Sequence, residues 1–488
     1  MPAIITNKFR IHNSEQFFES FSEASPNVYY LGIGRPQPFA TSTRPDARTE
    51  NEGTDTLPIT PVDDVVEEFY SFDDMLAAKK IASSDVSYVV PRRNWVTGTV
   101  YDYYRHDLGR RITGTATAQT SNSGQSTLFD ATFYVLTTAR NVYKCLDNNG
   151  GATSTVEPTG TSTNILVLGD GYKWKYMYTL TAAQQSNFLS TDFMAVATDA
   201  TISSAAVDGA INIIKIKSVG TGGTDGTHTS VPIRGDGSGG TCTVTIASGI
   251  VSAVTVTAAG TGYTFATIRV ADINTAGGGA LVDAELDCII EPKGGHGFNA
   301  IKEMGGFFVM VNVNLEGAET GSSGDFTTAN DFRKILLVRD PFSGGSAATG
   351  TTLRGVKVVR FAASPTPGNF QVDEEINQSS TGAVGKVVEW DSTNRLLYYM
   401  QTRFNDEGAD SNGNGTALSG ANVITGTTSS ATGTPGTASE TVDSVVLTGG
   451  YAAAEIDADT GDVIYIEQRV PITRASDQTE NIKLIIEF

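Results

Sequence analysis

The stretch 461–488 constrains the fold of this chain more than any other part of its sequence. It reads GDVIYIEQRVPITRASDQTENIKLIIEF, with one short apolar run at 462–466 and another at 483–488. An apolar strand at a chain end would be an exposed, sticky edge unless it paired inside a sheet. Its expected neighbour is the other end of the chain, where AIITNKFR at 3–10 also reads as a strand. We therefore expect both ends to close one frame that carries the residues between them.

The charge balance excludes several classes of partner. The formal net charge is −20, from 54 acidic and 34 basic side chains among 488 residues. Binding to phosphates or to anionic lipids requires a surplus of Lys and Arg, so neither nucleic acid nor a membrane is the expected partner. The start of the chain lacks the apolar core of a signal peptide, and no apolar run reaches the length of a membrane span. The expectation is a protein made in a reducing cytoplasm.

Glycine and hydroxyl residues point to a mainly β fold. The 52 glycines, together with many Thr and Ser residues, favour turns and strands, with only a few short helices, and the length favours several domains. We expect helices at 14–21, 75–81 and 181–189, and a hairpin at 133–146. Two internal repeats mark inserted β-modules. Residues 211–222 match 251–262, which suggests two similar hairpins, and residues 376–385 match 424–433.

These patterns predict a frame interrupted by two modules. The predicted segments are a β-rich frame domain at 1–204, a Gly/Thr-rich module at 205–285, a continuation of the frame at 286–345, a small antiparallel barrel-like module at 346–450, and C-terminal strands at 451–488 that complete the frame.

No motif makes a strong case for catalysis or for a cofactor. Three widely spaced cysteines and four isolated histidines give neither a disulfide framework nor a zinc pattern, and each cysteine is expected to be a small buried residue. A G-x-G-x-x-G run at 235–240 precedes a strand instead of a helix, so it reads as a plain turn. Asp410, Asn412 and Asn414 open like a calcium loop, but Ala421 stands where the bidentate Glu belongs. We expect no catalytic residue, cofactor or metal, and the sequence leaves open whether this loop binds a cation.

A few basic and aromatic residues stand out as candidates for a protein interface. Arg and Trp are enriched at interface hot spots, and the aromatic strand 172–178 reads as core on one side and interface on the other. The alternative for the arginines is internal ion pairs that pin loops to the frame. The candidates are Arg92, Arg93, Trp95, Tyr172, Trp174, Arg469 and Gln478.

Several frame segments, taken together and in order, resemble a known family. They are AIITNKFR at 3–10, VVPRRNWVTGTVYDYY at 89–104, VYKCLDNNGG at 142–151, GDGYKWKYMYTL at 169–180 and IYIEQRVPITRASDQTENIKLIIEF at 464–488. This set is similar to the baseplate wedge subunits of T4-like contractile-tailed phages, the gene product 8 type. The two Gly/Thr-rich inserts are not part of the resemblance.

The resemblance implies a structural, non-enzymatic virion protein of the tail baseplate, assembled in the host cytoplasm. It implies a homodimer that bridges other wedge proteins and holds them while the baseplate rearranges during sheath contraction. Two alternatives remain. One is a tail adhesin whose β-inserts recognise host-surface glycans. The other is a polysaccharide-cleaving tailspike, which would need many regular β-helix repeats where this sequence has two pairs.

Overall fold

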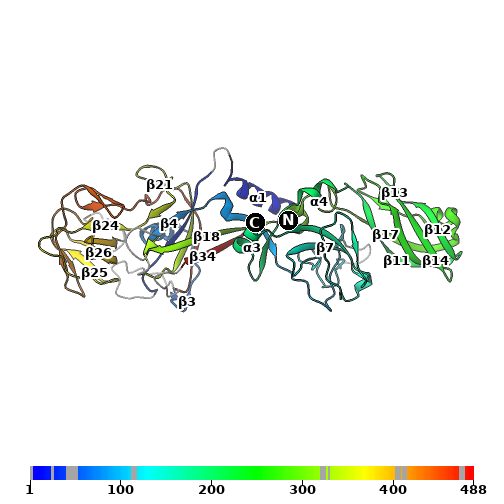
Figure 1. The fold of residues 1–488 in the computed structure, drawn as a ribbon, viewed down its shortest axis with the longest axis horizontal. Helices are drawn as coiled ribbons and strands as arrows, with labels where there is room; N and C mark the ends of the chain where they lie inside the picture. The colour runs from blue at the N-terminus through cyan, green and yellow to red at the C-terminus, as the bar shows by residue number, and fades with distance from the viewer. Residues whose placement is uncertain are drawn as a thin grey trace. The chain divides into compact units, whose positions relative to one another are not determined.

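The computed structural model describes residues 4–23, 27–39, 53–111, 118–318, 326–327, 330–401, 408, 411, 415–471 and 479–488. The fold is mainly β with short helices, as predicted from the composition (Figure 1). The chain forms two compact units. Unit 1 contains residues 1–18, 87–310 and 485–488, and unit 2 contains residues 19–86 and 311–484. Both chain ends therefore belong to unit 1, and the boundaries of the five predicted segments stay predictions.

An antiparallel sheet rich in aromatic residues organises unit 1. Its strand order is β6 (Tyr134–Leu136), β7 (Asn141–Asp147), β9 (Lys173–Thr179) and β8 (Leu166–Val167). The predicted hairpin is confirmed by the β6–β7 pairing, with Tyr134 opposite Lys144. The helix expected at 181–189 is α3 (Ala182–Phe188), and Thr181 and Gln184 form a capping box at its start. We call this sheet the aromatic sheet.

The two chain ends meet in unit 1, but not as two strands. The last strand is confirmed as β34 (Thr479–Glu487), which pairs with β18 (Phe308–Ala318) beside β5 (Val86–Pro91) and β10 (Phe193–Ala195). The strand predicted at 3–10 is wrong, because α1 (Asn7–Glu19) is a helix and Ile4 and Ile5 are exposed.

Contacts of one helical face explain why the first segment is not a strand. The guanidinium of Arg10 donates to the carbonyl oxygen of Phe488 and lies 3.6 Å from the centre of the Phe307 ring. One turn later the Ser14 hydroxyl donates to the carbonyl oxygen of Gly306 at 2.8 Å. Residues spaced by four lie about 6 Å apart along a helix but about 13 Å apart along a strand. The partners of Arg10 and Ser14 are adjacent, since the N–H of Phe488 donates to the carbonyl of Phe307, so these contacts favour α1.

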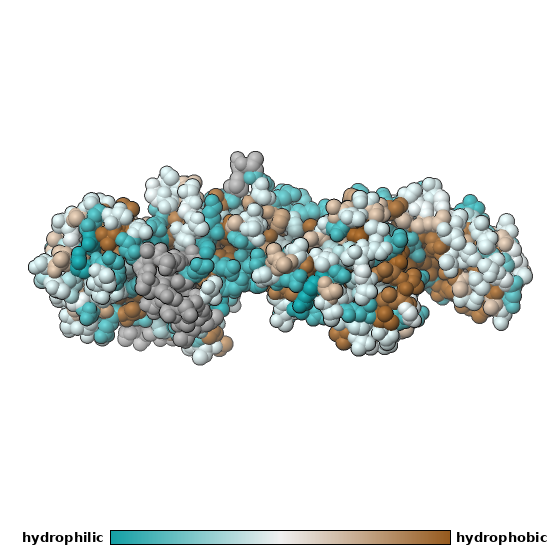
Figure 2. Space-filling view, in the orientation of Figure 1, coloured by the Kyte–Doolittle hydropathy of each residue, from teal (hydrophilic) through white to brown (hydrophobic). Residues whose placement is uncertain are grey.

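Residues 209–290 form a β-module within unit 1. Its strands are β11 (Ile211–Gly223), β12 (Gly226–Pro232), β13 (Arg234–Gly235), β14 (Thr241–Ala247), β15 (Ile250–Ala258), β16 (Ala266–Thr267) and β17 (Gly279–Ile290), with a short helix α5 (Val270–Ile273) and a π-turn at Asn274–Gly278. The surface over β12 and β14 is mostly pale in Figure 2, as expected for Thr, Ser and Gly.

The first sequence repeat becomes two adjacent strands of this module. The N–H of Ile211 donates to the carbonyl of Ala259, and the N–H of Gly223 donates to that of Gly249, both at 3.0 Å, so β11 and β15 run side by side. The expectation of two similar hairpins is wrong. β11 pairs along its length with β17, whereas β15 pairs with β14.

Unit 2 contains a five-stranded antiparallel sheet. Its order is β23 (Thr352–Arg354), β4 (Met75–Lys80), β1 (Tyr29–Gly34), β20 (Lys334–Arg339) and β33 (Asp462–Gln468), so the predicted strand at 462–466 is confirmed. The helix expected at 75–81 is wrong, because that segment is β4, between β1 and β23. The helix lies earlier, as α2 (Val65–Asp73), and the carboxylate of Asp64 accepts from the N–H of Glu67 at its start.

A second sheet of unit 2 contains the second sequence repeat. Its order is β29 (Thr432–Gly433), β28 (Ile424–Gly426), β25 (Glu375–Gln378), β26 (Ala383–Asp391), β27 (Leu396–Met400), β24 (Lys357–Arg360) and β32 (Tyr451–Ala452). Each repeat copy is a hairpin with the same register, Ile376 opposite Gly385 and Ile424 opposite Gly433. The two copies pair with each other through Ile376 and Gly426, so a local two-fold axis relates them.

The ends of this second sheet also approach each other. Just after β24, Phe361 forms an antiparallel bridge with Pro435, and the N–H of Ala362 donates to the carbonyl of Thr434 at 2.8 Å. The antiparallel pairing differs from the parallel coils of a β-helix. The remaining short elements are β2 (Gly53–Thr54), β3 (Leu57–Pro58), β19 (Phe326–Thr327), β21 (Phe342–Ser343), β22 (Ser346–Ala347), β30 (Glu440–Val442), β31 (Val445–Leu447), α4 (Ala200–Ser204), α6 (Ala300–Met304) and single 3-10 turns at Ser83–Asp85 and Asn149–Gly151.

Candidate interaction surface

Two arginines of the segment that follows β5 are bound to the body of unit 1. The guanidinium of Arg92 donates to the carbonyl of Ser190 at 2.7 Å and to the side chain of Asn94 at 3.0 Å. Arg93 donates to the carbonyl of Phe129 at 2.8 Å and lies 4.5 Å from the centre of the Tyr134 ring. Both arginines thus hold loops of unit 1 by donating to backbone carbonyls. The sequence analysis had offered two other roles for them, internal ion pairs or contacts with a partner protein. Both side chains remain half-buried.

Trp95 lies between the aromatic sheet and two bridged surface loops that carry exposed valines. Its indole N–H donates to the Ser154 hydroxyl at 3.1 Å, and its ring packs against the aromatic sheet. An antiparallel bridge between Thr99 and Ser154 joins the two surface loops around it. Exposed valines on these loops are Val96, Val100 and Val156, with exposed fractions of 55%, 36% and 40%. We call these three residues the valine patch.

Asp170 holds the loop that carries Val156. Its carboxylate accepts from the N–H of Thr155 at 2.9 Å, from the N–H of Val156 at 3.1 Å and from the Ser154 hydroxyl at 3.2 Å. Burial works against the charged form, but these hydrogen bonds lower the pKa of Asp170 below its usual value. The patch is therefore held in a defined conformation, which lowers the entropy cost of binding a partner.

Two predicted interface residues lie in the core instead. The side chains of Tyr172 and Trp174 are fully buried and stack with their ring centres 5.6 Å apart. The Tyr172 hydroxyl donates to the carbonyl of Ala152 at 2.6 Å, and burial raises its pKa to about 12. A partner docking on the outside of unit 1 cannot touch either ring. Strict alternation predicted the strand, but not that both of its faces are covered.

The other candidates lie outside this surface. Arg469 belongs to unit 2, where its N–H donates to the carbonyl of Arg333 at 2.8 Å and its guanidinium lies 5.7 Å from the centre of the Phe332 ring. Gln478 and the possible cation loop at Asp410, Asn412 and Asn414 lie outside the described residues.

A buried cluster in unit 1 has the residue types of a catalytic site but no access for a substrate. Glu303 pairs with Lys144 and accepts from the N–H groups of Gly297 at 2.9 Å and Asn299 at 3.2 Å. Burial alone would raise the pKa of Glu303, but the Lys144 charge and the contact with His296 lower it to about 2. The side chain of Lys144 is 0% exposed and His296, beside the pair, is 4% exposed. The cluster therefore fastens α6 and the loop before it onto β7.

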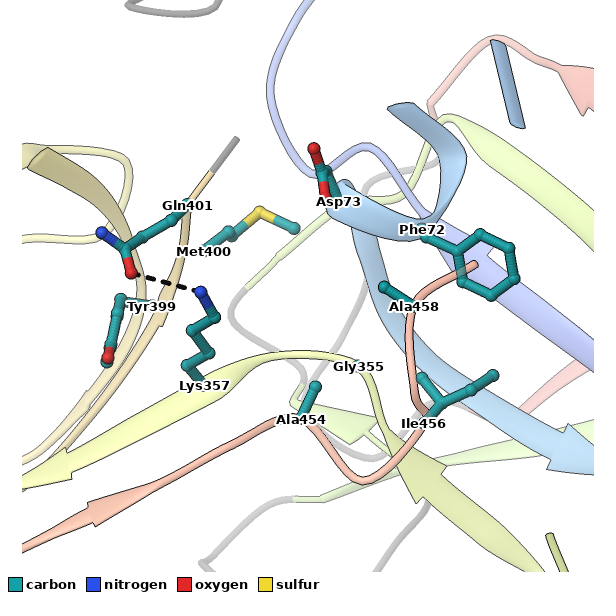
Figure 3. A pocket seen from close by; sticks show the side chains of 10 residues that line it. All are labelled: Phe72, Asp73, Gly355, Lys357, Tyr399, Met400, Gln401, Ala454, Ile456 and Ala458. Carbon is teal, nitrogen blue, oxygen red and sulfur yellow. Dashed lines mark hydrogen bonds between the residues drawn. The ribbon is translucent and has the colours of Figure 1, made fainter. Parts of the chain in front are cut away.

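A pocket of about 130 Å³ lies within unit 2 (Figure 3). Its walls come from α2, β27, the start of β24 and the segment 454–458. Figure 3 shows Lys357 reaching toward Gln401, with 3.2 Å between the amine and the amide oxygen, while Phe72 and Ile456 form an apolar wall. Sites for drug-sized ligands occupy about 300–1,000 Å³. This pocket therefore has room for only a small molecule.

Among the described residues, no group of three or more His, Cys, Asp or Glu side chains is placed to hold a metal ion. Within the same part of the chain, no helix is long and apolar enough to cross a bilayer. The three cysteines are buried, as predicted, and burial raises the pKa of Cys242 to about 11 and that of Cys288 to about 12.

Comparisons with known proteins confirm the resemblance that the sequence suggested. Residues 3–150 match the model of the family described as Bacteriophage T4, Gp8. The chain is also 23% identical over 209 residues to the baseplate wedge protein gp8 of Enterobacteria phage T4. That alignment covers 40% of this chain and 60% of the relative. The family model thus ends before β8, β9 and the β-module, and it includes α1 and the Trp95 loop.

Proposed function

We propose that this chain is a structural subunit of a phage tail baseplate wedge. The observation that carries the proposal is the family match over residues 3–150, because it spans the clamped N-terminal helix and the loop that carries Trp95. The weaker alignment to a baseplate wedge protein points the same way. On this proposal the chain acts in the virion tail, after assembly in the host cytoplasm, and catalyses no reaction.

The proposed role is mechanical, and it requires surfaces that do not deform under load. Arg10 clamps the first helix to the last strand, while Arg92 and Arg93 fasten loops of unit 1 to backbone carbonyls. Such contacts support a subunit that keeps its shape while its neighbours move. We propose a homodimer that bridges other wedge proteins during sheath contraction.

The valine patch is the part of unit 1 that we propose contacts a partner. Its exposed apolar side chains stand on loops held by Asp170 and Ser154, with half-buried arginines nearby. Tryptophan and arginine beside a rigid apolar centre are typical of interface hot spots. The three valine side chains themselves carry no charge, which suits an apolar contact.

Sedimentation velocity tests this proposal. We expect the purified chain to be a dimer at micromolar concentration and to co-sediment with co-expressed baseplate proteins of its own phage. Val96→Asp should weaken either the dimer or the binding of a baseplate protein at least tenfold, because it places a charge in an apolar contact. Val167→Asp is the matched control, since Val167 is also an exposed valine of unit 1. A monomer that binds none of those proteins would refute the proposal.

A further inference from the structure

Unit 2 exposes a run of apolar side chains between β3 and the first turn of α2. We call residues 57–66, which read LPITPVDDVV, the apolar strip. Successive members of the run are at most three positions apart, so no gap between neighbouring Cα atoms exceeds about 11 Å. Single exposed apolar residues are common, but a group this dense marks an interaction site. Its exposed side chains, at fractions from 42% to 75%, are Leu57, Ile59, Val62, Val65 and Val66.

Two buried cations hold the ends of the apolar strip. Ahead of it, the Asp55 carboxylate accepts from two nitrogens of the Arg333 guanidinium, both at 2.9 Å. After it, Glu67 pairs with the amine of Lys334. Arg333 and Lys334 are consecutive residues at the start of β20, and both are buried. The strip is therefore fastened to the five-stranded sheet at both ends, which lowers the entropy cost of binding a partner.

The strip offers side chains instead of a free strand edge. Pro58 and Pro61 have no N–H group, so neither can donate to an added strand. The turn that follows is closed by a bond from the N–H of Asp64 to the carbonyl of Val62 at 3.1 Å. A partner must therefore pack against the apolar side chains.

The charge of the strip selects the kind of partner. The strip contains no Lys or Arg. The carboxylates of Asp63 and of the nearby Glu68 have no partner within the part of the chain that the structure describes. The preceding segment 40–52, ATSTRPDARTENE, has too few apolar side chains to cover the strip. A complementary partner is apolar and carries a Lys or Arg beside its apolar side chains.

The start of unit 1 has this chemistry. We call residues 4–9 the N-terminal segment. Its exposed apolar side chains are Ile4 at 85%, Ile5 at 71% and Phe9 at 54%. Lys8 is also exposed, and its amine has no partner among the residues that the structure describes. The contacts of Arg10 hold the segment on unit 1 without covering these side chains.

We propose that the apolar strip of one copy binds the N-terminal segment of a second copy. The isoleucines and Phe9 pack on the valines of the strip, and Lys8 faces Asp63. Each chain carries both surfaces, so two copies related by a two-fold axis make the contact twice and leave neither surface free. This contact rests on the proposed homodimer, whose interface it identifies.

Cysteine cross-linking in the full chain tests the contact. Two single variants, Ile5→Cys and Val62→Cys, are co-expressed with different affinity tags and mildly oxidised. The three native cysteines are buried, so they do not react. We expect a disulfide-linked pair that contains both tags. Val446→Cys is the matched control for Val62→Cys, since both valines lie in unit 2 and are 69% and 64% exposed, and it should give no such pair.

A charge exchange tests the pairing of Lys8 with Asp63 without a cross-link. Lys8→Glu and Asp63→Lys should each raise the Kd of the dimer about fivefold, because an exposed ion pair contributes little but is made twice here. The double variant, which carries both changes, should return the Kd close to that of the parent. Sedimentation equilibrium measures all four proteins.

The possible failures are distinguishable. A dimer without the Ile5–Val62 product would overturn this contact and leave the homodimer standing. A disulfide between two Val62→Cys chains would overturn it as well, because the strip would then face itself. Protection of Val62→Cys from a thiol reagent only by a co-expressed baseplate protein would assign the strip to that protein instead. A chain that is monomeric at micromolar concentration would refute the homodimer and this contact together.

Discussion

The aromatic sheet and the β-module of unit 1 bury their strands with different side chains. Tyrosine and tryptophan fill the sheet core, and the hydroxyls of Tyr172 and Tyr178 reach carbonyls of neighbouring segments. Small aliphatic residues fill the module core, with Tyr263 as its one tyrosine among the described buried residues. Aromatic residues with polar tips tie loops to a core, whereas aliphatic residues pack only against one another. The tyrosines of the sheet therefore bind neighbouring segments, whereas the core of the module contains only residues of the module.

The largest expected effect comes from the buried ion pair under the aromatic sheet. Lys144→Met leaves the Glu303 carboxylate buried without its partner, so the free energy of unfolding should fall by about 3–5 kcal/mol. Urea unfolding followed by tryptophan fluorescence measures it, because Trp95 and Trp174 both lie at this sheet. The double variant Lys144→Met with Glu303→Leu should recover most of the loss. A single variant as stable as the parent would contradict the buried-pair account.

A core truncation in the module separates the two regions most clearly. Ile246 on β14 is 2% exposed, so Ile246→Ala should destabilise the module by about 2–4 kcal/mol. Amide hydrogen exchange should speed up in β14 and β15 and stay unchanged in β7 and β9. Faster exchange in both sheets to the same extent would mean that the module and the sheet unfold as one body.

Acid should weaken the loops of the aromatic sheet. The Asp102 carboxylate accepts from the N–H and hydroxyl groups of Ser123 and Thr132. Burial opposes this, but the bonds lower its pKa. Because the folded pKa is depressed, the stabilisation is fully present above the unfolded value of about 3.9 and is lost as pH falls through the folded value.

The matching measurement is thermal unfolding between neutral and acidic pH. Asp102→Asn should cost about 1–2 kcal/mol at neutral pH, and its deficit relative to the parent should shrink below pH ~4. In the module, Asp236 accepts from Thr264 and Phe265 at the surface, so Asp236→Asn should have the smaller effect. Equal losses of stability from the two substitutions would contradict the expectation that the buried carboxylate of the sheet matters more than the exposed one of the module.

The smallest effect is expected from an exposed pair of the module. Lys217 and Glu285 are each 58% exposed, so Glu285→Gln should change the unfolding free energy by about 0–0.5 kcal/mol. Thermal melts of the parent and variant should overlay. A loss above about 1 kcal/mol would mean that these outer strands depend on charge more than their exposure suggests.

Local sequence patterns correctly predicted several strands and one helix. The apolar runs at 462–466 and 483–488, the hairpin at 133–146 and the capped helix after Thr181 are all present in the structure. Two assignments failed because a distant contact overrode local preference. Residues 7–10 are helical because Arg10 and Ser14 share the face toward the chain end, and Met75–Lys80 is a strand between β1 and β23.

The candidate surface was less predictable than the fold. Sequence alone could pick out Arg92, Arg93 and Trp95 as unusual. Their partners, two backbone carbonyls for the arginines and the Ser154 hydroxyl for the tryptophan, are far away in the chain. It could not separate Tyr172 and Trp174 from surface aromatics, because both faces of β9 are covered by other segments. The valine patch carries no motif, since its three valines lie on two loops that the fold joins through the bridge between Thr99 and Ser154.

Immunogold labelling of the phage particles that carry this protein tests the proposed function most directly. The antibody should be raised against the purified chain, and the particles viewed by negative-stain electron microscopy. A structural wedge subunit predicts gold clustered around the tail baseplate. Gold at the fibre tips would instead indicate the adhesin, and particles without any label would contradict a place in the virion.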